Sequence, residues 1–67
     1  MTGDRYWQTA TKVCTPKELQ ALELVRAGLG EWQAALRLGI SRRSLRDRVT
    51  NAERKIVQAT RQQETAA

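Results

Sequence analysis

The sequence predicts an all-α fold, a small bundle of three main helices preceded by a short N-terminal helix. Three observations favour it: Thr15 and Ser41 are good helix caps, glycines stand where the first two main helices would end, and apolar residues recur at helical spacing. A chain of 67 residues has room for one domain. We expect this domain over residues 15–60, with an N-terminal segment, residues 1–14, packed on or flanking it and a frayed polar tail over residues 61–67.

The first main helix is predicted over residues 16–27. Thr15 can cap it, Pro16 suits the first helical position, and Glu18 completes a capping box with Thr15. Gly28 can adopt the left-handed conformation that ends a helix. Ahead of this helix, three apolar residues with helical spacing predict the short N-terminal helix: Trp7, Ala10 and Val13.

The second helix is predicted over residues 31–38, and the third from Ser41 to about residue 60. Gly39 ends the second helix, whereas no glycine or proline interrupts the third. The third helix carries an apolar stripe at spacings of four, three and four residues: Leu45, Val49, Ala52 and Ile56. Its opposite face is polar and contains two arginines: Arg43, Asp47, Thr50 and Arg54.

Charge is the clearest global property of the chain. Lys and Arg number twelve against seven Asp and Glu, the net charge is +5, and the pI is about 10.4. Such an excess favours nucleic acid or an anionic membrane surface as a partner. No apolar run approaches the ~20 residues of a membrane span, and the N-terminus lacks the pattern of a signal peptide. We therefore expect a cytoplasmic protein that makes no membrane contact.

Catalysis and metal binding are not expected. The chain has one cysteine and no histidine, so neither an internal disulfide nor a zinc site of the usual kind can form. No paired carboxylates, activated nucleophile or phosphate-binding loop is recognisable. The sequence thus predicts no enzyme activity, no cofactor and no metal.

Residues 31–49, EWQAALRLGISRRSLRDRV, have the pattern of a short helix, a glycine-centred turn and a capped basic helix. Ala35 is small where two helices would meet, Gly39 tolerates the positive φ of the turn, and Ile40 supplies an apolar plug after it. With TPKELQALELVRAGLG before it and NAERKI after it, this text resembles the DNA-binding domain of LuxR-type regulators and the fourth conserved region of bacterial sigma factors. The resemblance covers residues 15–55 and implies a helix-turn-helix whose last helix enters the major groove of duplex DNA.

The resemblance also implies roles for individual residues. Those expected to face base edges are Arg42, Arg43, Arg46, Asp47 and Thr50. Those expected near phosphates are Gly30, Glu31, Trp32, Ser44 and Arg48. Further phosphate candidates, which the resemblance does not supply, are Lys17, Ser41, Asn51 and Arg54, and the alternative for Lys17 is a solubilising charge. The chemistry agrees, since an arginine can fork to guanine and a threonine methyl can touch thymine. Asp47 can either accept a hydrogen bond from cytosine or hold Arg43 in place.

Three features depart from the family pattern. Gly30 replaces the usual Ser or Thr before the second helix, and Ala34 replaces a larger Ile or Val in its core. Trp32 and Leu36 stand where the family is usually polar, on the face opposite Ala34. We expect this pair to be covered by the aromatic N-terminal segment, by a second protomer or by another protein. The alternative is a rotated helix that buries both side chains in the core.

These observations predict sequence-specific binding of double-stranded DNA by a small transcription regulator, of a kind that phages and mobile elements encode, in the bacterial cytoplasm or nucleoid. Two alternatives stay open: an architectural protein for recombination directionality or DNA packaging, and a protein-interaction module. Beside DNA, the partner would be a second copy or a larger protein, such as RNA polymerase or a recombination or packaging enzyme. The candidate protein-interface residues are Tyr6, Trp7, Trp32, Leu36, Ile56 and Val57, of which the last two fit the end of the core stripe equally well.

Overall fold

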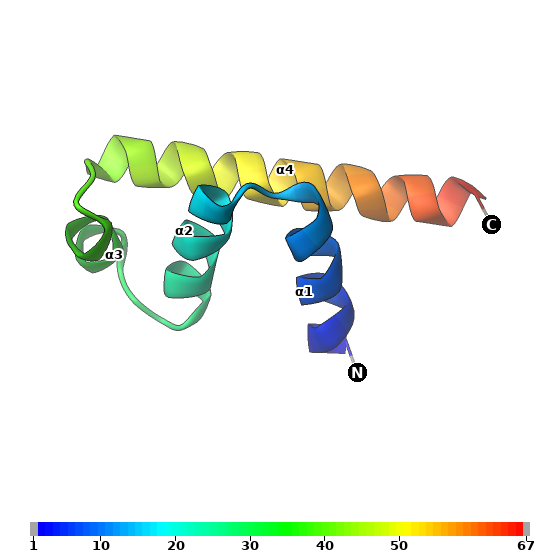
Figure 1. Cartoon of the computed structure of the whole chain (residues 1–67), viewed down its shortest axis with the longest axis horizontal. Coiled ribbons are helices and arrows are strands. Elements are labelled where there is room, and N and C mark those ends of the chain that lie inside the picture. The colour runs from blue at the N-terminus through cyan, green and yellow to red at the C-terminus, as the bar shows by residue number, and fades with distance from the viewer. Residues whose placement is uncertain (1, 67) are drawn as a thin grey trace.

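Four helices make up the chain in the computed structural model, which describes residues 2–66 and the side chains of residues 5–62. They are α1 (Thr2–Val13), α2 (Pro16–Arg26), α3 (Glu31–Leu38) and α4 (Arg42–Ala66). The predicted all-α class is confirmed, and no strand occurs among the described residues. The long α4 is the axis of the fold, with α3, α2 and α1 placed along it in that order (Figure 1).

The predicted ends of α2 are confirmed. Thr15 Oγ1 accepts from the Glu18 N–H at 3.2 Å, and Glu18 Oε1 accepts from the Thr15 N–H at 2.9 Å, which completes the capping box. At the other end Gly28 has φ +99°. The Leu29 N–H then reaches back to the carbonyl of Leu24 at 3.2 Å, the reverse turn by which many helices end at a glycine.

The turn between α3 and α4 also follows the prediction. Gly39 has φ +69°, and the Ile40 N–H donates to the Ala35 carbonyl at 3.0 Å, so the chain reverses within three residues. Ser41 caps α4, because its Oγ accepts from the Ser44 N–H at 3.1 Å. The helix, turn and capped helix predicted over residues 31–49 are therefore present as local structure.

Two clusters of buried side chains share α4. The first fills the space between α3, α2 and the beginning of α4, and its fully or nearly buried members are Ala21, Ala34, Ala35 and Leu45. The second lies under α1 and contains Ala10, Cys14, Leu22, Ala52 and Ile56. Val49 is half-buried and packs against both clusters, so the predicted apolar stripe of α4 is confirmed as its core-facing side.

The predicted N-terminal helix is present, and only its length differs from the expectation of a short helix. α1 has 12 residues and packs on α4, where Ala10 is fully buried. The tail over residues 61–67 was expected to be frayed, whereas α4 continues as a helix to Ala66. α4 can extend past Ile56 because the backbone hydrogen bonds of a helix are local and no glycine or proline follows Ser41 in the chain.

Candidate nucleic-acid interface

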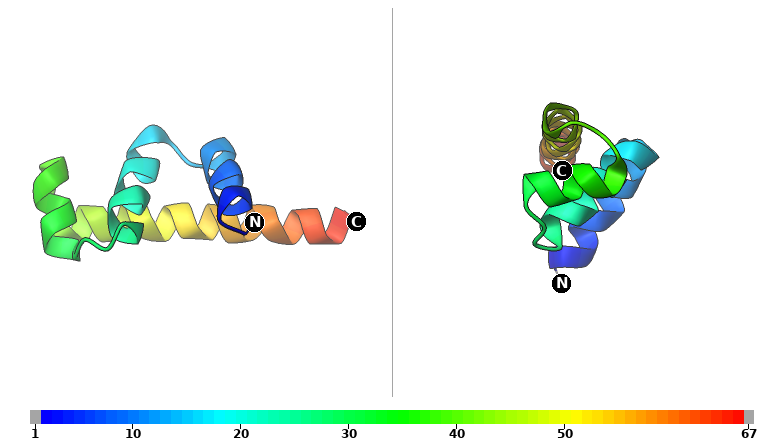
Figure 2. Two further views of the ribbon diagram at one scale, coloured as in Figure 1. Left: turned by 90° about the horizontal axis from the view of Figure 1, so that it is seen from below. Right: turned by 90° about the vertical axis from the view of Figure 1, so that its left-hand side faces the viewer.

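The shorter helices lie on one side of α4 and leave its other side open (Figure 2). The five side chains predicted to face base edges are all exposed: Arg42, Arg43, Arg46, Asp47 and Thr50. Arg43, Asp47 and Thr50 lie on the open side, whereas Arg42 and Arg46 lie at its edge toward α3, where they contact Trp32 and Glu31. Arg54 is exposed one turn further along, and Arg48 is half-buried. Five arginines thus fall within the first 13 residues of α4. Among the described residues, no other helix covers the outer side of α4, which is basic and is bordered by Arg42 and Arg46.

The N-terminus of α3 borders this face. Gly30 is its N-cap, with φ −69° and ψ 161°, and no side chain accepts from the amides of the first turn. The backbone N–H groups of residues 31–33 therefore have no acceptor within the helix, and the helix dipole adds partial positive charge there. Gly30 has no side chain that could cap these amides, so they are open to an external anion.

An ion pair joins α3 to α4 at the same place. Arg46 Nε donates to Glu31 Oε2 at 3.0 Å, and Arg46 Nη2 donates to Glu31 Oε1 at 3.4 Å. The hydrogen bond from Arg46, and then its charge, lower the pKa of Glu31, and the same bond raises the pKa of Arg46. Sequence reasoning assigned both residues to DNA but missed the pair, because the two lie 15 positions apart.

The exposed apolar pair on α3, Trp32 and Leu36, decides whether this helix is rotated to bury both side chains. Trp32 is 62% exposed and Leu36 is 68% exposed. The prediction of a rotated α3 is wrong, since neither side chain lies in the core. Together with Ala35, Ile40 and Arg42 they line a shallow hollow of about 190 Å³, in which the Arg42 guanidinium lies 5.6 Å from the centre of the Trp32 ring.

The aromatic N-terminal segment does not cover this pair. Tyr6 and Trp7 are half-buried and pack against the cluster under α1, with their rings edge to face at 5.5 Å. The Arg26 guanidinium lies 4.2 Å from the centre of the Tyr6 ring. The prediction that this segment covers the exposed face of α3 is therefore wrong, because α1 packs on the part of α4 farther from α3 (Figure 1).

Two of the remaining interface candidates are separated by burial. Ile56 is 4% exposed and belongs to the cluster under α1, so it is part of the core and not a dimer seam. Val57 is 49% exposed. Val57 points away from the core because successive residues of a helix are rotated by 100°.

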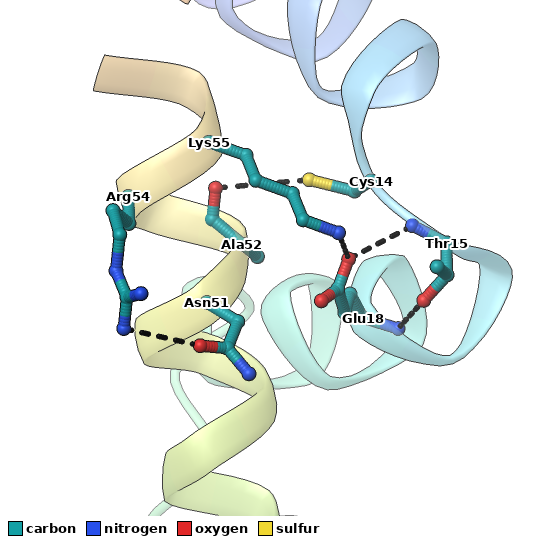
Figure 3. A network of polar contacts seen from close by, with 7 residues as sticks. All are labelled: Cys14, Thr15, Glu18, Asn51, Ala52, Arg54 and Lys55. Atoms are coloured by element: carbon teal, nitrogen blue, oxygen red, sulfur yellow. Dashed lines mark hydrogen bonds and ion pairs between the residues drawn. The ribbon is translucent and has the colours of Figure 1, made fainter. Parts of the chain in front are cut away.

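Most of the remaining phosphate candidates form side-chain hydrogen bonds within the chain. Lys17 is exposed on the first turn of α2. The two serines interact with each other, since Ser41 Oγ donates to Ser44 Oγ at 3.0 Å. Arg54 Nη2 donates to Asn51 Oδ1 at 3.2 Å (Figure 3). Ser41, Ser44, Asn51 and Arg54 therefore each have a side-chain partner within the chain.

One partly buried polar contact between α2 and α4 was not predicted from the sequence. Lys55 Nζ donates to Glu18 Oε1 at 2.9 Å, so the capping residue of α2 is tied to α4 (Figure 3). The bond from Lys55, and then the one from the Thr15 backbone, lower the pKa of Glu18. Beside them the Cys14 Sγ–H donates to the Ala52 carbonyl at 3.7 Å, and burial raises the pKa of Cys14. The one sequence signal for this contact was the glutamate of the capping box.

No protein-family profile, curated protein or solved structure matches this chain. The geometry and the charge of the α4 surface are therefore the features that bear on function. Among residues 2–66, no helix combines the length and the apolar character needed to cross a bilayer.

Proposed function

We propose that this chain binds duplex DNA in a sequence-specific manner through the open face of α4. The observation that carries the proposal is the α3–Gly39–α4 unit, with five arginines in the first 13 residues of a helix whose outer side is uncovered. The major groove of B-form DNA is about 12 Å wide and admits one α-helix. A net charge of +5 adds attraction to the phosphate backbone.

The proposed contacts fall into two kinds. Arg43, Asp47 and Thr50 project from the outer side of α4, and together with Arg46 at the edge of that side they would meet base edges. The free amides at the N-terminus of α3 and the exposed Lys17 would meet phosphates. The first kind specifies the sequence and the second fixes the register on the duplex. Affinity should fall steeply with salt, because each neutralised phosphate releases a counterion.

Selection of bound duplexes from a randomised pool, followed by affinity measurement on the enriched sequence, tests the proposal. Arg43→Ala is expected to weaken binding to that sequence by roughly 5- to 150-fold, the equivalent of ~1–3 kcal/mol for one bidentate base contact. The matched control is Arg5→Ala, which removes the same charge from an exposed position on α1. No enriched sequence, or equal losses in the two variants, would overturn sequence-specific reading by α4.

The biological setting belongs to the same proposal. A single domain with few phosphate contacts binds weakly at physiological salt, so a regulator of this size would act as a pair or beside a larger DNA-bound protein. A bacterial cytoplasm or nucleoid fits such a role. An architectural role would instead bend the duplex, and a circular-permutation bending assay on the enriched sequence separates the two.

A second candidate function, binding of a protein partner, is favoured by the exposure of Trp32 and Leu36. Arg37 and Arg42 flank this pair, so a short amphipathic helix with acidic side chains fits it better than a second copy of the same basic chain. The apolar area that this pair could bury is also small for a dimer interface, since a tryptophan buries at most ~250 Å². A stable dimer needs ~800 Å² from each partner.

Peptide display against the wild-type chain, counter-selected on Trp32→Lys with Leu36→Lys, tests this second function. Both side chains are exposed, so the double variant should keep its Tm within about 4 °C. Enriched peptides should carry acidic residues and apolar residues three or four positions apart. Basic peptides, or no peptide that distinguishes the two proteins, would contradict it.

A further inference from the structure

We propose that Glu31 sets the DNA specificity of the surface by holding Arg46 and by opposing phosphates at the N-terminus of α3. The inference rests on the proposed function and adds to it a residue that does not itself contact a base. Glu31 begins α3 and Arg46 lies one turn into α4, so the pair spans the two helices of the helix-turn-helix.

The geometry leaves Arg46 both oriented and available. A guanidinium has five N–H donors in one plane, and Glu31 engages the Nε–H and one Nη2–H. Three donors remain, including the outer edge formed by the two Nη atoms. That edge has the fork geometry that matches O6 and N7 of guanine. Glu31 therefore fixes the plane of the guanidinium while leaving its base-reading edge open.

The charge of Glu31 has a second effect on binding. Glu31 is the acidic residue in the first turn of α3, whose free amides would attract an incoming phosphate. A negative side chain at this position repels the phosphate and competes with it for Arg46. Both side chains are about half or more exposed, so the pair is weak and DNA can rearrange it. On a cognate duplex, the oriented Arg46 gains its base contact, which offsets the repulsion between Glu31 and the phosphate. On a random duplex, that base contact is absent and only the repulsion acts.

The test compares Glu31→Gln with Glu23→Gln. Each variant removes one negative charge from an exposed position, so the net charge changes equally. Affinity is measured for the enriched duplex and for a randomised duplex at several salt concentrations. We expect Glu31→Gln to bind the randomised duplex on the order of fivefold more tightly than Glu23→Gln does. The enriched duplex should change less, so the ratio of the two affinities falls.

A second measurement reports on Arg46 without DNA. In the free wild-type protein, the Arg46 Nε–Hε signal in a nitrogen-edited NMR spectrum should exchange with water more slowly than that of the exposed Arg43. Glu31→Gln should remove this difference, and Glu23→Gln should leave it intact. Equal exchange at Arg46 and Arg43 in the wild type would overturn the positioning role.

The outcomes separate the two proposals. A wild-type chain that binds no duplex overturns the proposed function, and this inference with it. Duplex binding with equal gains for Glu31→Gln and Glu23→Gln overturns this inference alone and leaves the proposed function standing.

Discussion

Replacing Glu18 with glutamine is expected to lower the stability of the fold and to reduce its dependence on pH. The Glu18 side chain is 11% exposed, and Oε1 accepts from the Thr15 N–H and from Lys55 Nζ, each at 2.9 Å. Glutamine also completes capping boxes, so the bond to Thr15 should survive the change. The bond to the Lys55 ammonium loses its charge assistance, a loss of about 1–2 kcal/mol for a pair with one partly exposed partner.

Thermal unfolding followed by circular dichroism at pH 7 measures this loss. For a domain of this size it corresponds to a fall in Tm of about 5–15 °C. The matched control is again Glu23→Gln on the same helix, whose side chain is exposed, and its Tm should lie within about 4 °C of the wild type. A Glu18→Gln variant as stable as this control would refute a stabilising role for the Glu18–Lys55 contact.

The difference in Tm between the wild type and Glu18→Gln should depend on pH in one direction. The contacts of Glu18 lower its pKa from the ordinary 4.5. A carboxyl whose pKa is lower in the folded state stabilises the fold above its unfolded pKa and loses that contribution as the pH falls through the folded pKa. The difference in Tm between wild type and Glu18→Gln should therefore be complete at pH 7 and shrink below about pH 4.5. A difference that stays constant from pH 7 to pH 3 would refute the charge as its cause.

Two further pairs of substitutions, each with its matched control, test the turn and the core. Gly39→Ala should lower Tm, because the residue has φ +69° and an L side chain there costs about 1–2 kcal/mol, although its Cβ would meet no atom within 4 Å. Gly30→Ala, at φ −69°, should lower Tm by less than half as much, and equal effects would contradict the backbone argument. Ile56→Ala should lose about 2–5 kcal/mol in urea unfolding, since the side chain is 4% exposed. Val57→Ala, at a 49% exposed position, should lose no more than about 0.5 kcal/mol, and a similar loss in both would show that Ile56 is not core.

The features that could be predicted from the sequence are those set by neighbouring residues. The capping box needs only Thr15 and Glu18 three positions apart, and the two helix ends need only a glycine at positions 28 and 39. The apolar stripe of α4 likewise follows from spacing along one helix. None of these requires knowledge of where the other helices lie, so each could be placed within one or two residues.

The features that could not be predicted depend on how the helices are rotated and crossed. Glu31 and Arg46 meet across two helices, as do Glu18 and Lys55, which are 37 positions apart. A shift of one position on either helix rotates its side chain by 100° and would separate each pair. The exposure of Trp32 could not be predicted for the same reason. The hydrophobicity of its side chain favoured a position in the core or under another segment, whereas the rotation of α3 is set by Ala34 and Ala35, which pack into the core.

The position of α1 separates the stability of the fold from the proposed DNA contacts. Ala52 is fully buried, and its small side chain allows α1 to approach closely enough for the Cys14 thiol to reach the Ala52 carbonyl. A helix-turn-helix of ~40 residues is near the lower limit for folding alone, so the cluster under α1 adds burial that the unit needs. This cluster lies away from the arginines at the beginning of α4 (Figure 1). Removing Ile56 should therefore impair folding without a direct effect on binding, whereas removing Arg43 should impair binding and leave folding intact.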